Sequence, residues 1–197
     1  MDKQVIISVG RQYGSCGHIV AQRIAEKLNI DIYDRNILKD IAEKHDSDYD
    51  EMLKYDEKPR NLLFSKRRGE YNSSVEVETA KMQFDFLKEK ADEGKSFVVI
   101  GRCAETVLKD YPNHISVFIS ADMDCRIKRV VEADHQTERE AKYTIARKDK
   151  KRRDYHDMHS EKAWGEAETY DLCLNISKMD IDTAADFIIN YADIMIK

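Results

Sequence analysis

Hydrophobic residues in this chain form short, nearly continuous runs that alternate with longer stretches of helical periodicity. The runs are rich in β-branched residues, as in strands buried on both faces, and lie at residues 5–9, 30–33, 97–100, 115–119 and 170–176. Between them, apolar spacing predicts helices, of which the main ones cover residues 19–28, 35–44, 74–93, 122–133, 137–159 and 181–196. Strands separated by helices predict a three-layer, doubly wound α/β fold with five parallel strands.

End signals support several of these helices. Thr137 and Glu140 have the spacing of a capping box, Asp180 or Asp182 precedes the last helix, and Gly94 follows the helix at 74–93. One segment breaks the alternation. Residues 46–72 are polar and contain Pro59, Gly69 and the basic run 66–68. This composition predicts an irregular or partly helical excursion, the best candidate for a moving flap.

Composition bounds the class of protein. A chain of 197 residues with 42% hydrophobic residues fits one folded domain, and 36% charged residues give it a well-solvated surface. No membrane-spanning run and no signal peptide are found, so we expect a cytoplasmic protein with reduced cysteines. The net charge of −5 argues against non-specific binding of nucleic acid. An anion site must therefore be a local basic patch.

The segment after the first strand carries the clearest chemical signal. It reads GRQYGSCGH over residues 10–18, with three glycines between a buried strand and a helix. Glycines let the backbone curl until several amides converge, and the helix N-terminus adds partial positive charge. The pattern predicts a phosphate cradle. The alternative is a tight turn that binds nothing, but such a turn does not need three glycines together with Arg11.

This loop departs from the phosphate-binding pattern G-x-x-x-x-G-K-[ST]. Counted from Gly10, the last three positions hold Ser15, Cys16 and Gly17; one inserted residue aligns residues 14–17 with G-S-G-K instead. The lysine is missing in either register. We hypothesise that another cation replaces it, and the candidates are Arg11, His18, Arg147 and Lys151. Cys16 is interpreted as a small loop residue.

Segments in one order along the chain resemble the cytidylate kinase-like branch of the P-loop nucleoside monophosphate kinases. They read GRQYGSCGHIVAQRIAEKL, IYDRNIL, VVIGRCAETVL, ISVFISADMDCRIKRV and WGEAETYDLCLNIS. The resemblance implies a nucleotide kinase-like fold and transfer of a phosphoryl group from ATP, with Mg²⁺, to a small acceptor such as CMP. It also implies an acceptor-side helical insertion at residues 46–93 and a basic, lid-like helix at residues 137–163, both within a single domain at residues 1–197.

The same resemblance assigns roles to residues. ATP would be bound by the loop, through Gly10, Tyr13, Gly14, Ser15, Cys16, Gly17 and His18. The Ser15 hydroxyl is the candidate ligand of Mg²⁺, directly or through water. Asp34 and Arg35 begin the acceptor site, and Arg102 resembles the arginine that holds the acceptor phosphate, a task that suits a bidentate guanidinium.

The basic helix supplies the remaining candidates. Six of the seven residues at 147–153 are cationic, and at least half of them are expected to be an ordinary solvated face. Arg147, Lys151 and Arg152 are our choices for stabilising the transferred phosphoryl group on lid closure. Asp149 would orient one of these cations or contact the acceptor base.

Two other readings stay open. The missing lysine favours a non-catalytic nucleotide- or phosphate-binding protein that keeps the kinase fold, whereas Arg102 and the lid cations favour the enzyme. Nucleic-acid binding through residues 66–68 and the basic helix is disfavoured, because these segments lack aromatic residues between the cations.

We expect the following histidines at the surface: His114, His135, His156 and His159. Arg126 and Arg129 are either near the donor site or ordinary surface charges, and the oligomeric state stays open.

Overall fold

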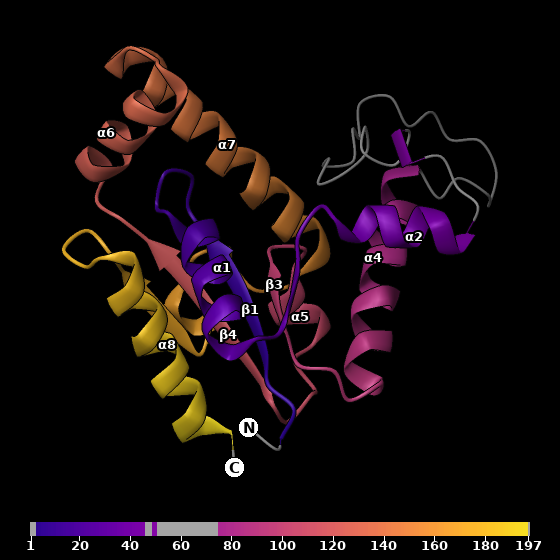
Figure 1. Cartoon of the computed structure of the whole chain (residues 1–197). Coiled ribbons are helices and arrows are strands. Elements are labelled where there is room, and N and C mark those ends of the chain that lie inside the picture. The colour runs from indigo at the N-terminus through magenta and orange to yellow at the C-terminus, as the bar shows by residue number, and fades with distance from the viewer. Residues whose placement is uncertain (1–2, 46–48, 51–74, 197) are drawn as a thin grey trace.

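Five β-strands form one parallel sheet in the order β2-β3-β1-β4-β5 (Figure 1). They are β1 (Ile6–Arg11), β2 (Asp31–Tyr33), β3 (Phe97–Ile100), β4 (His114–Ser120) and β5 (Leu172–Asn175). The computed structural model describes residues 3–45, 49–50 and 75–196. The five predicted strands and the doubly wound α/β arrangement are confirmed.

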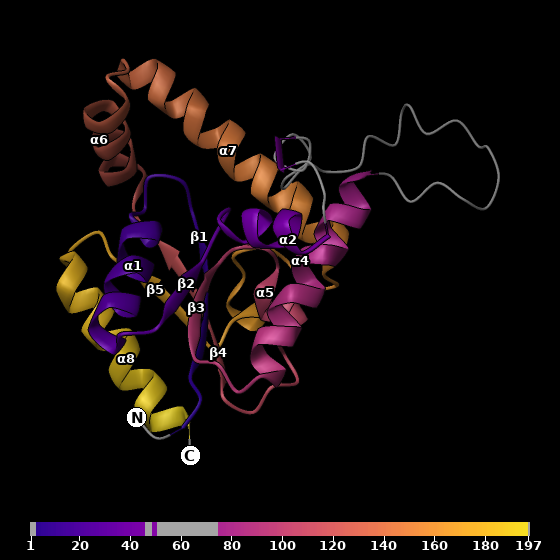
Figure 2. The same cartoon turned by 45° about the vertical axis from the view of Figure 1, so that its right-hand side comes forward.

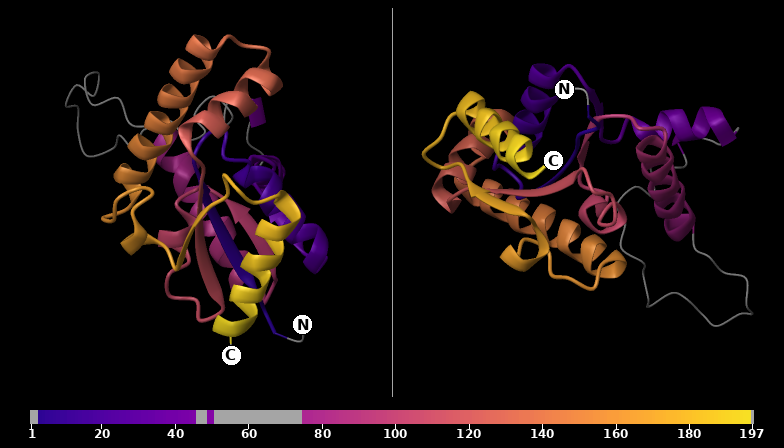
Figure 3. Two further views of the ribbon diagram at one scale, coloured as in Figure 1. Left: turned by 90° about the vertical axis from the view of Figure 1, so that its left-hand side faces the viewer. Right: turned by 90° about the horizontal axis from the view of Figure 1, so that it is seen from below.

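Helices cover both faces of this sheet. They are α1 (Gly17–Leu28), α2 (Ile37–His45), α4 (Val75–Asp92), α5 (Ala104–Val107), α6 (Met123–Asp134), α7 (Glu138–His159) and α8 (Ile181–Met195), with a short 3₁₀ helix at Ala167–Thr169. Viewed from below, α1 and α8 lie on one side of the sheet, while α5 and the end of α7 lie on the other (Figure 3). The helices α2 and α4 pack together beside the β2 edge (Figure 2).

The central strands are buried on both faces, because successive side chains point to opposite faces of the sheet and each face is covered by helices. In β1, Ile7 and Val9 join the core under α1 and α8, whereas Ile6 joins the core formed with α2, α4 and α5. The edge strand β5 is different, since its residues alternate between partly buried and exposed. The continuous apolar runs of the sequence therefore mark the centre of the sheet more faithfully than its edge.

The first strand is longer than its apolar run. It continues through Gly10 and Arg11, which pair with Phe118 and Ile119 of β4. A Cβ on Gly10 would lie 2.8 Å from the Phe118 ring and 3.1 Å from Tyr170. The absence of a side chain at Gly10 thus lets two aromatic rings pack against the strand.

The structure confirms the predicted helix-end signals at α4, α7 and α8. The Thr137 hydroxyl accepts a hydrogen bond from the Glu140 amide, and the Glu140 carboxylate accepts one from the Thr137 amide. Together these two bonds form the capping box of α7. Asp180, rather than Asp182, caps α8 by accepting from the Thr183 amide. Gly94 has φ +73°, the left-handed conformation that commonly ends a helix.

The topology places a crevice between β1 and β3. These strands are neighbours, yet β1 leads into α1 on one face and β3 leads into α5 on the other. Connections that diverge from adjacent strands mark the switch point at which open α/β sheets bind ligands. The long helix α7, which contains the basic run at residues 147–153, passes above this edge of the sheet (Figure 1).

Some predictions fall partly or wholly on residues that the structure does not describe. Of the insertion at 46–93, only residues 49–50 and the segment from α4 onward are described. The predicted flap at 46–72, except for residues 49–50, and the basic run at 66–68 lie outside the described residues. Within the described part of the chain, no helix is both long enough and apolar enough to cross a membrane.

Candidate functional site

The glycine loop between β1 and α1 is held open by its own backbone conformation. Gly14 has φ +76° and Cys16 has φ +64°, and both values lie in the left-handed region. The fully buried hydroxyl of Ser15 donates to the Gln12 carbonyl at 2.9 Å and accepts from the Gly17 amide at 3.3 Å. Ser15 therefore shapes the loop from within, and its hydroxyl is already occupied on both sides.

Amides of this loop divide into two groups. The Gln12 amide donates to the Ile119 carbonyl of β4, and the Tyr13 amide donates to the Asp149 carboxylate at 2.7 Å. The amides of Gly14, Cys16 and His18 make no hydrogen bond to any residue that the structure describes. These three residues line one hollow of about 230 Å³. Beside this hollow, the loop thus has three backbone donors that no described residue uses, as an anion cradle requires.

Helices α6 and α7 hold the loop through the peptide groups of Tyr13. The Tyr13 amide binds Asp149 of α7, and its carbonyl accepts from Arg126 Nε of α6 at 2.7 Å. Arg126 and Asp149 also form an ion pair with each other, and Arg126 is only 4% exposed. Arg126 is therefore no surface charge, and Asp149 contacts the loop and Arg126. The role of Asp149 toward a lid cation or the acceptor base stays a prediction.

The end of β3 forms a second, tighter turn beside the loop. Gly101, Arg102 and Cys103 have φ values of +73°, +61° and +50° in succession. Each non-glycine residue in this region costs about 1–2 kcal/mol. Such strain persists where the surroundings over-determine it, commonly at functional sites. Its effect here is to bury Arg102, whose side chain is 1% exposed, at the carboxyl end of the sheet.

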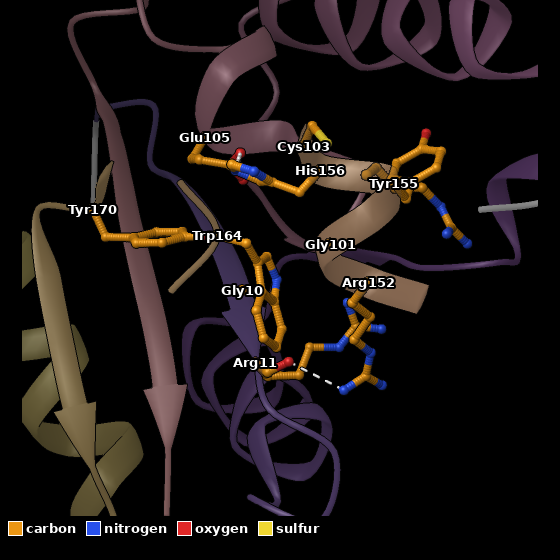
Figure 4. A pocket seen from close by; sticks show the side chains of 11 residues that line it. Gly10, Arg11, Gly101, Cys103, Glu105, Arg152, Tyr155, His156, Trp164 and Tyr170 are labelled. Carbon is orange, nitrogen blue, oxygen red and sulfur yellow. Dashed lines mark hydrogen bonds and ion pairs between the residues drawn. The ribbon is translucent and has the colours of Figure 1, made fainter. Parts of the chain in front are cut away.

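Three arginines line a small cavity between the two turns, and Figure 4 shows two of them, Arg11 and Arg152, at the same end of it. Arg11 comes from the end of β1, Arg102 from the turn after β3 and Arg152 from α7. Arg152 Nη1 donates to the Arg11 carbonyl at 3.1 Å, which fixes α7 against the end of β1. The cavity volume of about 20 Å³ leaves room for roughly one water molecule in this closed arrangement.

A buried acid and histidine line the same cavity. Glu105 of α5 and His156 of α7 are 8% and 3% exposed, and Glu105 Oε1 lies 3.0 Å from His156 Nε2. The expectation of a surface position is therefore wrong for His156, which is buried where α7 contacts Glu105 of α5. His114 is partly buried and lies 2.8 Å from the Ser8 hydroxyl. Burial lowers the pKa of His114 to about 4.

Asp34 connects the two turns. Its carboxylate lies 3.4 Å from His18 Nδ1 at the start of α1 and 3.8 Å from Arg102 Nη2. Arg35, in contrast, is exposed. Among the predicted lid cations, Arg152 lines both the loop hollow and the arginine cavity, whereas Arg147 and Lys151 are absent from the described residues that line either one. The structure thus brings Arg11, Asp34, Arg102 and Arg152 together.

Several residues of this site carry no distinctive sequence signal. Glu105 follows Arg102 by three residues, but Arg102 lies in the turn before α5. His156 follows Arg152 by four residues in α7, a spacing that places the two on one helix face. That periodicity is the signal that could have found His156. Nothing local distinguishes Arg126 or Tyr155 from other residues of amphipathic helices, because their roles depend on the packing of α6 and α7 against the loop and α5.

Comparisons with solved structures agree with this fold. The chain is 38% identical to an uncharacterised protein from Eubacterium ventriosum, covering 96% of this chain and 99% of that one with a TM-score of 0.76. Shikimate kinase from Bacteroides thetaiotaomicron is 14% identical, with coverages of 96% and 98% and a TM-score of 0.56. The APS kinase CysC of Mycobacterium tuberculosis, solved with AMPPNP and APS, is 16% identical, with coverages of 97% and 98% and a TM-score of 0.53.

These distant kinases establish the nucleotide kinase-like fold and nothing more specific. None of the curated proteins compared with this chain matches it. A family model provides the assignment, since the model of the cytidylate kinase-like family matches residues 6–178, from the start of β1 to just beyond β5. The matched range includes the glycine loop, the arginine cavity and α7. The chain belongs to the cytidylate kinase-like family.

Proposed function

We propose that the protein is a phosphotransferase that moves the γ-phosphoryl group of ATP to a small acceptor, with CMP as the first acceptor to test. One observation carries the proposal: backbone donors and arginine side chains converge from β1 and β3 on the switch point of the sheet. A phosphate chain needs such donors, because phosphoryl transfer is catalysed chiefly by positioning and by stabilising negative charge. Family membership supports the same chemistry.

The two spaces suit the two substrates. The loop hollow of about 230 Å³ offers the amides of Gly14, Cys16 and His18 to the phosphates of ATP, with Arg129 and Val130 on its outer wall. The arginine cavity adjoins it, and there Arg102 would hold the phosphate of the acceptor. Asp34, between His18 and Arg102, would contact the acceptor on the side facing α2.

Helix α7 is proposed to act as the lid, within the basic segment at residues 137–163. Its Arg152 reaches the junction of the two spaces and would stabilise charge on the group in transfer. Arg147 and Lys151 lie on the same helix and would approach only if α7 moves toward the sheet. A cavity that holds roughly one water molecule must widen to admit a phosphate, so α7 has to move away from the sheet for substrate entry and back toward it for closure.

The residues of the loop do not fit a direct Mg²⁺ site at Ser15. Its hydroxyl is fully buried and already bonded to Gln12 and Gly17. Mg²⁺ commonly keeps several waters and is held by substrate phosphates with few protein ligands. Among the described residues no group of three or more metal-ligating side chains is found. We therefore assign no step of the reaction to a Mg²⁺ ion bound by Ser15.

A coupled assay for ADP tests this proposal. The purified chain is incubated with ATP and Mg²⁺ against a panel of nucleoside monophosphates and small hydroxyl acceptors, with a blank lacking acceptor. We expect acceptor-dependent ADP release, greatest with one nucleoside monophosphate. Tight binding of an ATP analogue without any product would assign the chain to nucleotide binding instead, the reading that the missing lysine favours.

A further inference from the structure

The position that a lysine would occupy in the loop is closed by another side chain. With one inserted residue, Gly17 aligns with the lysine of G-x-x-x-x-G-K-[ST]. Gly17 does not have a left-handed φ, so its backbone would accept any residue. A Cβ on Gly17 would nevertheless lie 2.6 Å from the Cβ of Arg11 and 3.3 Å from that of Ile119. Gly17 is therefore required because Arg11 packs directly against it.

Arg11 extends from this contact into the centre of the site. As the last residue of β1 it is fixed by pairing with Ile119 of β4. Its side chain lines both the loop hollow and the arginine cavity, so it lies where the two spaces meet. Figure 4 shows Arg11 and Arg152 at the same end of the cavity. A phosphoryl group passing from donor to acceptor has to cross this junction.

The guanidinium of Arg11 also has unused donor capacity. Its Nε is buried and makes no hydrogen bond to any residue in the described part of the chain. A buried donor without a partner is unfavourable, and a buried cation normally has an anion beside it. Arg102 and Arg152 place two more positive charges at the same cavity, which raises the preference for an anionic ligand there.

We propose that Arg11 takes the place of the missing loop lysine and binds the phosphates of ATP across the junction. This inference rests on the proposed function. In the transfer, the acceptor oxygen forms a bond to the γ-phosphorus while the bond to the β–γ bridging oxygen breaks, and ADP leaves. Arg11 exchanges no proton. Its planar fork contacts two phosphate oxygens at once, where a lysine offers a point charge.

Exchanging the two side chains tests the inference. R11G removes the cation and opens the space beside position 17, and R11G/G17K returns a cation from the position of the lysine. R11M keeps the packing against Gly17 but removes the charge, so a loss of binding in R11M cannot be attributed to misfolding caused by the empty space beside Gly17. R139A, at an exposed position in the first turn of α7, is the matched control for loss of one arginine. Calorimetry measures the Kd for AMPPNP with Mg²⁺, and thermal unfolding checks the fold of each variant.

We expect R11G and R11M to weaken AMPPNP binding at least tenfold, R139A to change it less than twofold, and R11G/G17K to recover most of the loss of R11G. G17K alone should be destabilised, because its side chain meets Arg11. If the unaltered protein binds AMPPNP and R11M binds it equally well, the role of Arg11 is overturned while the proposed function stands. A folded R11G/G17K that recovers no affinity also overturns the replacement. No binding by the unaltered protein would overturn the proposed function itself.

Discussion

The turns that follow β1 and β3 begin alike and end differently. Each leaves a buried strand, passes through left-handed residues and enters a helix behind a cysteine, Cys16 in one and Cys103 in the other. The turn after β1 spreads over five residues, and three residues that line a hollow, Gly14, Cys16 and His18, have amides that bind no described residue. The turn after β3 takes three residues and buries the guanidinium of Arg102.

This difference shows two ways of making an anion site at one edge of a sheet. The wide turn offers several weak backbone donors, so no side chain of residues 12–16 decides its affinity. The tight turn offers one full charge on one strained residue, so its contribution depends on Arg102 alone. Substitutions at the two turns should therefore differ in size and in the substrate that they affect.

The largest effect is expected at Arg102. R102K keeps a positive charge but loses the planar fork, and removing one well-placed donor of this kind typically lowers the rate by about 10²–10³-fold. We expect kcat/KM for the best acceptor to fall on that order, measured by ADP release, while the Kd for AMPPNP changes less than threefold. R139K is the control. An equal loss of acceptor turnover and AMPPNP affinity would contradict the separation of the two turns.

A partly buried histidine at the opposite end of the strands provides the contrast to Arg102, which is buried yet always charged. His114 begins β4, and burial lowers its pKa from 6.5 to about 4. The unfolded chain therefore binds more protons between these values. The free energy of unfolding should fall by about 3 kcal/mol as the pH decreases from 6.5 to 4 and no further below that through this group.

Urea unfolding at several pH values checks this. The contribution of His114 is the difference in slope between the unaltered protein and H114Q, since both share the other titrating groups. H114Q should lose less stability than the unaltered protein between pH 6.5 and 4. Parallel curves for the two proteins would show that His114 does not titrate with a lowered pKa.

The sequence predicted the wide turn better than the tight one. Glycines at 10, 14 and 17 indicate a phosphate cradle because backbone donors need only conformational freedom. The five strands were likewise visible as apolar runs, since central strands are buried on both faces. The arginine cavity was not visible as such, because Glu105, Tyr155 and His156 reach it only after α7 has packed against α5. The reason for Gly17, the neighbouring side chain of Arg11, is equally a matter of tertiary packing.

Within the wide turn, Gly14 should be the most sensitive backbone position. G14A places a Cβ at φ +76° and 3.0 Å from the Arg126 carbonyl oxygen. G94A is a matched control, since Gly94 has φ +73° and no atom within 4 Å of the added Cβ. We expect G94A to lower the free energy of unfolding by about 1 kcal/mol and G14A to lower it by about 2 kcal/mol or more. Both variants strain the backbone, but only G14A also brings the new Cβ too close to a neighbouring atom. Equal losses in urea unfolding would show that Arg126 can move aside.

The smallest effects are expected at Cys16 and Cys103, which occupy corresponding positions in the two turns. Substitutions there test the comparison between the turns most directly. Cys16 and Cys103 both precede a helix in the left-handed conformation, so glycine relieves similar strain at each, about 1 kcal/mol. Cys103 is 4% exposed in a cluster with Ala80 and Tyr155, whereas Cys16 is only partly buried. At Cys103 the loss of buried side-chain contacts offsets the relief of backbone strain, while Cys16 loses fewer contacts.

C16G should therefore raise the melting temperature by about 1–3 °C, and C103G should leave it unchanged or lower it. A larger gain for C103G would mean that the strain after β3, rather than the packing around it, sets the stability of the tight turn.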